Sequence, residues 1–180
     1  ATDAVWEVAV DGSGALSLTS GVNYPVPIAE GVAGVLGNKV IVVGGVTNNE
    51  GGGFSTVQEA YFLDTSKDER DWAWEALPWI EVAENKTWED YLSPIEKKAR
   101  GRAYAVSGVR SDQFYIFGGR DYAVSTDPAP ERVHQEKLDI LSDCYVLSLK
   151  GPKPVWKRLA DLPRGMSAAP SAALPVGVSH

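Results

Sequence analysis

The sequence is poor in the side chains that bind metals. Among its 180 residues there is one cysteine, Cys144, and there are two histidines, His134 and His180. A single cysteine excludes an intrachain disulfide and a thiolate metal cluster, and two histidines are too few for a histidine-rich metal site. We therefore expect no metal and no cofactor.

Long hydrophobic runs and excess positive charge are also missing. Apolar runs such as residues 40–43 are far shorter than the ~20 residues of a membrane-spanning helix. Asp and Glu number 24 against 17 Lys and Arg, which gives a formal net charge of −7. An acidic surface repels phosphates and anionic lipids, so neither a nucleic acid nor a membrane is an expected partner.

The chain is instead rich in turn residues and large aromatics, with 18 glycines, 11 prolines and 6 tryptophans. These residues follow a repeated order: a strand-like run that ends in Gly-Gly, a strand with a tyrosine, and a tryptophan segment that ends in Leu-Pro. The matching pairs are Gly44 and Gly118, Tyr61 and Tyr145, and Trp74 and Trp156. Their spacings of 74, 84 and 82 residues agree well enough to indicate an internal repeat.

The repeat predicts an all-β fold built from kelch-type propeller blades of four antiparallel strands. Small residues at 31–35 and 103–108 suit inner strands near the axis. The apolar runs before each Gly-Gly suit second strands that are buried on both faces. Because a kelch unit has about 50 residues, the surplus is expected in insertions at residues 48–55, 81–98 and 121–140. Residues 88–98 and 131–141 look helical.

Three segments, TDAVWEV at 2–8, GVAG at 31–34 and GRAYAVS at 101–107, carry a closer resemblance. Their order over residues 2–149 resembles the later blades of the bacterial sialic acid mutarotases, the N-acetylneuraminate epimerase family. The chain then continues into another inner strand at 164–173, which favours the cyclically permuted branch of that family.

The resemblance implies a six-bladed propeller that interconverts the anomers of N-acetylneuraminate without a cofactor. It also implies a periplasmic or extracytoplasmic location, although the N-terminal residues contain no signal peptide. The family's proposed catalytic Glu, followed six residues later by Arg, precedes the TDAV strand. Here residue 1 is alanine, so this pair cannot be assigned to any residue of the chain.

The repeats divide the chain into four parts of one propeller domain. Residues 1–25 are predicted to form the outer strands of an incomplete blade, 26–98 and 99–163 two complete blades, and 164–180 the inner strand of a further incomplete blade. This amounts to about half of a six-bladed ring, so we expect a fragment of a chain of roughly double the length. The missing blades, or a second copy of the chain, would complete the ring.

The candidate site residues lie in loops predicted to share one face of the propeller. These loops follow each Gly-Gly doublet or lead into an inner strand. The carboxylates available for proton transfer are Glu30, Glu50 and Asp121. The predicted ligands of a small acidic sugar are Arg100, Arg102, Arg120, Arg164 and Asn49, because arginine binds a carboxylate through two parallel hydrogen bonds.

The leading hypothesis is a cofactor-free sugar mutarotase or epimerase that acts on an acidic sugar such as N-acetylneuraminate. The alternative is a non-catalytic kelch module that binds a protein or a glycan through the long insertions at 81–98 and 121–140. A third possibility, a copper-dependent kelch oxidase, finds no support, because that chemistry needs tyrosine, histidine and cysteine ligands in combination and only one cysteine and two histidines are present.

Overall fold

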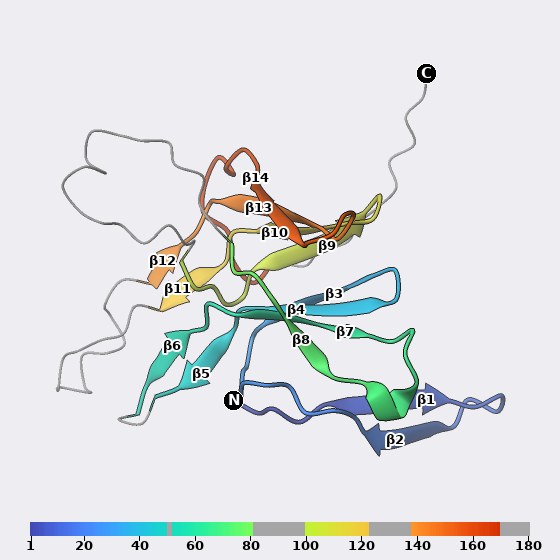
Figure 1. The fold of residues 1–180 in the computed structure, drawn as a ribbon. Coiled ribbons are helices and arrows are strands. Elements are labelled where there is room, and N and C mark those ends of the chain that lie inside the picture. The colour runs from blue at the N-terminus through green and yellow to red at the C-terminus, as the bar shows by residue number, and fades with distance from the viewer. Residues whose placement is uncertain (50–51, 81–99, 123–137, 170–180) are drawn as a thin grey trace.

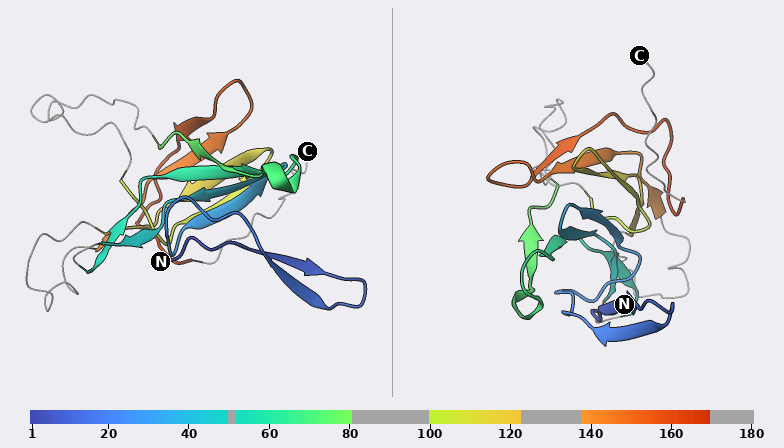
Figure 2. Two further views of the ribbon diagram at one scale, coloured as in Figure 1. Left: turned by 60° about the horizontal axis from the view of Figure 1, so that its bottom comes forward. Right: turned by 90° about the vertical axis from the view of Figure 1, so that its right-hand side faces the viewer.

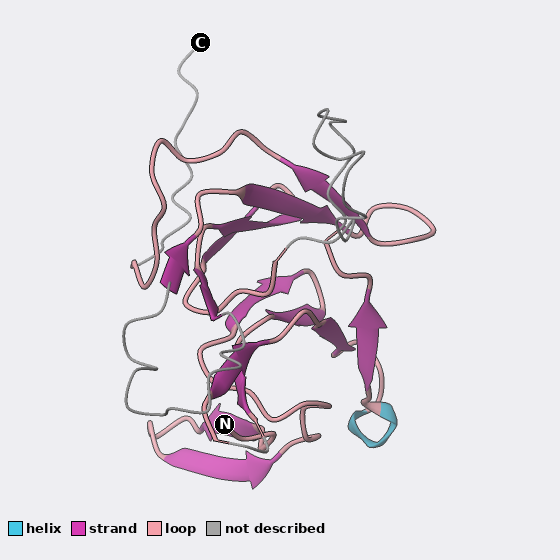
Figure 3. Cartoon of the chain, turned by 90° about the vertical axis from the view of Figure 1, so that its left-hand side faces the viewer, coloured by secondary structure: helices cyan, strands magenta, loops and turns pink. Residues whose placement is uncertain are grey.

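The computed structural model describes residues 1–49, 52–80, 100–122 and 138–169. These residues are nearly all β (Figure 1). The strands are β1 (Trp6–Val10), β2 (Leu16–Ser20), β3 (Val32–Leu36), β4 (Lys39–Val43), β5 (Val46–Asn48), β6 (Phe54–Thr56), β7 (Ala60–Asp64), β8 (Trp74–Leu77), β9 (Val106–Arg110), β10 (Gln113–Phe117), β11 (Arg120–Tyr122), β12 (Leu138–Ile140), β13 (Cys144–Ser148) and β14 (Val155–Arg158). In the described ranges the only helix is the 3₁₀ turn Glu69–Asp71 (Figure 3).

Two four-stranded antiparallel sheets form the centre of the molecule. The first blade has the strand order β3-β4-β7-β8, and the second blade has the order β9-β10-β13-β14. Three two-stranded sheets, β1–β2, β5–β6 and β11–β12, accompany them. The β1–β2 hairpin, the first blade and the second blade follow one another as successive layers (Figures 1 and 2). The prediction of an all-β, partial propeller is confirmed.

The Gly-Gly doublets join each blade to the next one. The Gly45 N–H donates to the Arg102 carbonyl at 2.8 Å, and the Gly119 N–H donates to the Met166 carbonyl at 2.8 Å. A Cβ atom on Gly44 would lie 2.3 Å from the Arg102 oxygen, and one on Gly118 would lie 2.3 Å from the Met166 oxygen. Both positions also have positive φ. Only glycine permits this backbone approach, which explains why both repeats contain the doublet.

The core lies between the two blades, and a small inner-strand residue makes room for it. A Cβ on Gly34 would lie 2.6 Å from the Phe114 ring, so the glycine lets β3 approach β10 closely. Ile41 and Val43 of the first blade join Tyr145 and Leu147 of the second blade in one buried cluster. Burial of these side chains provides most of the stabilisation between the blades.

The tryptophans of the outer strands repeat one contact. Trp74 Nε1 donates to the Val22 carbonyl at 3.0 Å, and Trp156 Nε1 donates to the Pro78 carbonyl at 2.9 Å. Each indole therefore reaches back to the chain that leaves the preceding outer strand. The tryptophans of the repeat thus link each layer to the preceding one.

The β1–β2 hairpin occupies the place of the two outer strands of a preceding blade. The Trp74–Val22 contact relates it to the first blade as the Trp156–Pro78 contact relates the first blade to the second. The Ile28 N–H donates to the Thr2 carbonyl just as the Met166 N–H donates to the Leu141 carbonyl. Leu141 leads into β13, and Thr2 leads into β1, so the two strands are equivalent.

Two details differ from the sequence-based expectations. The second strands are not fully buried on both faces: in β4, Ile41 and Val43 are buried while Val40 and Val42 are half-buried. Val40 and Val42 face the β1–β2 hairpin, which supplies only half a blade of cover. The expected helix at 131–141 is wrong at its end, because Leu138–Ile140 pairs with β11 as strand β12. The rest of that segment, and residues 88–98, lie outside the described residues.

The inner strand expected at 164–173 is described only to residue 169. Residues 164–169 contain no strand. They nevertheless make the backbone contacts that precede an inner strand: the Met166 carbonyl accepts from Gly119, and the Ala168 N–H donates to the Tyr104 carbonyl. The chain therefore approaches a third inner-strand position in the same way as it enters β3 and β9.

Candidate functional site

Loops from both blades meet at one end of the sheets, as the repeat predicted. Strands β6 and β11 lie side by side there (Figure 1), and Thr56 Oγ1 donates to Asp121 Oδ1 at 2.6 Å. The segments that lead into β3 and β9 reach the same end. The candidate site is therefore built by neighbouring blades, which hold side chains from distant parts of the chain together.

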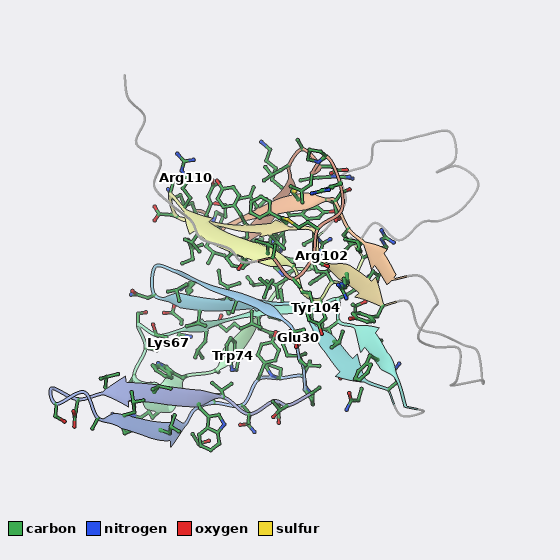
Figure 4. All side chains as sticks on the ribbon, turned by 180° about the vertical axis from the view of Figure 1, so that it is seen from behind. Glu30, Lys67, Trp74, Arg102, Tyr104 and Arg110 are labelled. Carbon is green, nitrogen blue, oxygen red and sulfur yellow. The ribbon has the colours of Figure 1, made fainter. Side chains whose placement is uncertain are left out.

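Three residues in left-handed backbone conformation lie in a row across this end. Glu30, Tyr104 and Ala168 have φ values of 58°, 53° and 53°. The Tyr104 N–H donates to the Glu30 carbonyl at 3.0 Å, and the Ala168 N–H donates to the Tyr104 carbonyl at 2.9 Å. Figure 4 shows Glu30 and Tyr104 close together, far from Arg110 at the other end of β9. Positive φ is uncommon outside glycine, and strained backbone is often concentrated at functional sites.

Arg120 adds a positive charge beside this row. Its Nε donates to Ser167 Oγ at 2.8 Å, and its guanidinium lies 5.5 Å from the centroid of the Tyr104 ring. The side chain is half-buried. In the described part of the chain, no carboxylate forms an ion pair with it. A guanidinium held by a hydroxyl and an aromatic face can still bind a carboxylate.

Tyr104 keeps its proton at neutral pH. Burial is the largest cause that raises the pKa of its phenol, followed by the negative charge of Glu30 and the neighbouring Tyr122. The positive charge of Arg120 acts in the opposite direction but does not reverse the shift. The phenol is therefore a hydrogen-bond donor beside an arginine and a glutamate.

Arg102 lies behind this surface and makes its contacts within the second blade. It is 1% exposed, and its Nη2 donates to Asp143 Oδ2 at 2.8 Å while its Nη1 donates to the Gly118 carbonyl at 3.1 Å. Its guanidinium also lies 5.0 Å from the Tyr145 ring centroid. Burial alone would raise the pKa of Asp143, but the charge and hydrogen bonds of Arg102 hold it below its usual value. The Arg102 guanidinium is thus held by groups of its own blade.

The other predicted residues are not brought together with Arg120. Arg100 is 3.8 Å from Asp121 Oδ2, so Asp121 lies between Arg100 and Thr56 and links the two blades. Asn49 accepts from Ser55 Oγ at 2.8 Å within the loop between β5 and β6. Arg164 is exposed, and Glu50 lies outside the described residues.

Sequence reasoning did not select Tyr104, Tyr122 or Ser167. Tyr104 follows Glu30 by the same 74 residues that separate the glycine doublets, so the repeat could have pointed to it. The signal was hidden because the equivalent residues share a backbone conformation rather than a side-chain type. For Ser167 there was no comparable signal, because its contact with Arg120 spans 47 residues.

The fold is similar to that of solved structures, among them the structure of YjhT. The TM-score is 0.61 at 13% sequence identity, and the match covers 92% of this chain and 47% of YjhT. The chain thus spans about half the length of YjhT, and at this identity the likeness extends to the fold alone. No protein-family model and no curated protein sequence matches the chain.

The described residues provide neither a metal-binding cluster nor a membrane-spanning helix. These residues hold no group of three or more His, Cys, Asp or Glu side chains placed to bind a metal ion. They also contain no helix that is long and apolar enough to span a membrane.

Proposed function

We propose that this protein is part of a sugar mutarotase or epimerase that interconverts the anomers of an acidic sugar such as N-acetylneuraminate. The substrate would bind over Arg120, Tyr104 and Glu30. The proposal combines the sequence resemblance to the sialic acid mutarotases with the charge and geometry of this cluster. The same resemblance favours a periplasmic or extracytoplasmic location.

The observation that carries the proposal is the setting of Arg120. A half-buried guanidinium is fixed by Ser167 and by the face of Tyr104, on a protein whose formal net charge is −7. A fixed arginine binds a carboxylate with less loss of conformational freedom than a mobile one. The arginine would thus orient the sugar carboxylate beside the reacting carbon.

Anomer exchange requires one proton to be removed and another to be supplied. A base takes the proton of the anomeric hydroxyl as the bond between the anomeric carbon and the ring oxygen breaks, and an acid protonates that oxygen. Rotation and closure in the reverse sense give the other anomer. Glu30 would act as the base and Tyr104, with its raised pKa, as the acid.

Proton NMR of N-acetylneuraminate anomers after dissolution of one anomer tests the proposal. We expect Arg120→Met to raise KM and Glu30→Gln to lower kcat by roughly 100-fold, the size of a lost general base. Arg110→Met is the matched control, since Arg110 lies exposed at the other end of β9 and should change neither value. An exchange rate equal to that of buffer would overturn the proposal, and sugar binding without exchange would indicate a binding module.

A further inference from the structure

The β1–β2 hairpin exposes an apolar face that is unusual for a folded protein. The register pairs Val8 with Leu18 and Val10 with Leu16, which places them on one face with Trp6. Their exposed fractions range from 60% for Val8 to 70% for Leu16. We call Trp6, Val8, Val10, Leu16 and Leu18 the hairpin face. Contiguous exposed apolar surface of this kind marks an interaction site.

The interface inside the molecule shows what covers such a face. Tyr145 and Leu147 hold in β13 the places that Trp6 and Val8 hold in β1. They are 1% and 0% exposed, because they pack in one cluster with Ile41 and Val43 of the first blade. The hairpin face therefore resembles the side of a blade that packs against the preceding blade. Its complementary partner is the side of another blade that faces the following blade.

The second blade has such a side, which would face a following blade. Tyr115 and Phe117 hold in β10 the places that Ile41 and Val43 hold in β4. Their rings are stacked with centroids 6.2 Å apart. Both are half-buried, whereas Ile41 and Val43 are fully buried. In the stack of layers the β1–β2 hairpin lies first and the second blade last (Figure 1). The two outer surfaces of the stack therefore correspond to the two sides of its internal interface.

The backbone at these ends is complementary as well. Strand β1 is equivalent to β7 and β13, which pair with the second strands β4 and β10. In the part of the chain that the structure describes, β1 pairs only with β2. At the other end, Met166 and Ala168 make the contacts that precede an inner strand. The β1–β2 hairpin therefore corresponds to the outer half of a blade, and residues 166–168 lead toward the position of an inner half.

We propose that a second copy of this chain covers the hairpin face, so that two copies associate head to tail. Each copy presents its hairpin face to the end of the other copy that carries Tyr115, Phe117 and residues 165–168. The contact joins two different surfaces, and it closes because each copy uses both of them. It also covers the unpaired edge of β1, which is otherwise open to unspecific strand pairing.

Sedimentation equilibrium of the 180-residue chain tests this proposal. We expect a concentration-dependent mass that approaches two copies, accompanied by a blue shift of tryptophan fluorescence as Trp6 is buried. Val8→Lys should weaken the association at least tenfold. Ala9→Lys, on the opposite face of the same strand, should leave it unchanged. A mass of one copy at every concentration would overturn the proposal and would indicate that other polypeptide covers the face.

Mixing variants tests the head-to-tail arrangement. Phe117→Glu should also give single copies, and Tyr115→Glu serves as a second variant of the same surface. Thermal unfolding of each variant shows whether it is folded. A mixture of Val8→Lys and Phe117→Glu should recover the double mass, because one of the two contacts then joins two unaltered surfaces. A Phe117→Glu protein that is folded and still paired would overturn the arrangement, since two hairpin faces would then contact each other.

Discussion

The two blades share a backbone arrangement but differ at one position before the inner strand. Ile28 in the first blade and Arg102 in the second both precede an inner strand. Each blade also has an acidic residue just before its third strand, Glu59 or Asp143, which accepts a hydrogen bond from a tyrosine two residues later. In the second blade the acid binds a buried arginine, whereas in the first blade Glu59 is exposed.

The difference shows that the repeat conserves geometry rather than chemistry. The carbonyl of the residue before the inner strand is the repeated element: the Gly45 N–H donates to the Arg102 carbonyl, the Gly119 N–H to the Met166 carbonyl, and the Thr2 N–H to the Ile28 carbonyl. The type of its side chain varies. The second blade therefore contains a charged pair where the first blade has Ile28 and an exposed Glu59, and substitutions should separate the two.

The largest effect is expected from Asp143→Ala compared with Glu59→Ala. The first substitution leaves the fully buried Arg102 guanidinium without its carboxylate, which costs about 3–5 kcal/mol in the free energy of unfolding. The second removes an exposed carboxylate and should cost less than about 0.5 kcal/mol. Urea unfolding of both variants measures the difference, and similar losses would contradict the contrast between the blades.

Alanine at the doublets should affect both blades alike. Gly44→Ala and Gly118→Ala combine positive φ with a Cβ placed 2.3 Å from a carbonyl oxygen of the next blade, for a loss of about 2–4 kcal/mol. Gly37→Ala is the matched control: its φ is also 60°, but no atom lies within 4 Å of its Cβ. It should cost only about 1 kcal/mol. Equal losses at Gly37 and Gly44 would mean that conformation alone, and not close approach, requires the glycine.

A smaller effect should come from pH, again through Asp143. Its folded pKa lies below the usual value, so it contributes stability above the unfolded pKa of about 3.9, and this stability is lost as pH falls through the folded pKa. Asp143→Asn should remove this contribution. The difference in unfolding free energy between the wild type and this variant should be constant above about pH 5 and shrink below about pH 4. A constant difference down to acid would contradict the role of the charge.

The smallest effect is expected from the tryptophan contacts. Trp74→Phe and Trp156→Phe each remove one indole hydrogen bond to the preceding layer, worth about 1 kcal/mol. The losses should be similar, because the two contacts are equivalent. A far larger loss for Trp156, measured by thermal unfolding, would show that the contact between complete blades depends on it more than the contact with the hairpin does.

The fold was predictable because its signals are local and repeated. Gly-Gly doublets, the apolar runs before them and outer tryptophans recur at similar spacings and are visible without any contact being known. The shared loop face followed from the same order. Residues 131–141 were misjudged at their end because the helical pattern of a short segment was weaker than the pairing of Leu138–Ile140 with β11.

The candidate site was predictable only in part. Arg120 and Glu30 were found because they follow or precede recognisable strand ends. Arg102 carried the same signal, but its burial depends on Asp143, 41 residues away in the sequence, and no local pattern reveals that partner. Tyr104 and Ser167 became visible only when positive φ and contacts between blades were known.

By itself the sequence determined the all-β repeat, the glycine doublets and the set of charged loops, because these depend on the conformational limits of neighbouring residues. Only the tertiary structure decided which arginine is buried, which carboxylates are paired and which apolar residues remain exposed. Those properties arise from contacts between residues tens of positions apart. The single cysteine and the two histidines excluded a disulfide and a histidine-rich metal site from the beginning, and the spatial arrangement then singled out Arg120, Tyr104 and Glu30.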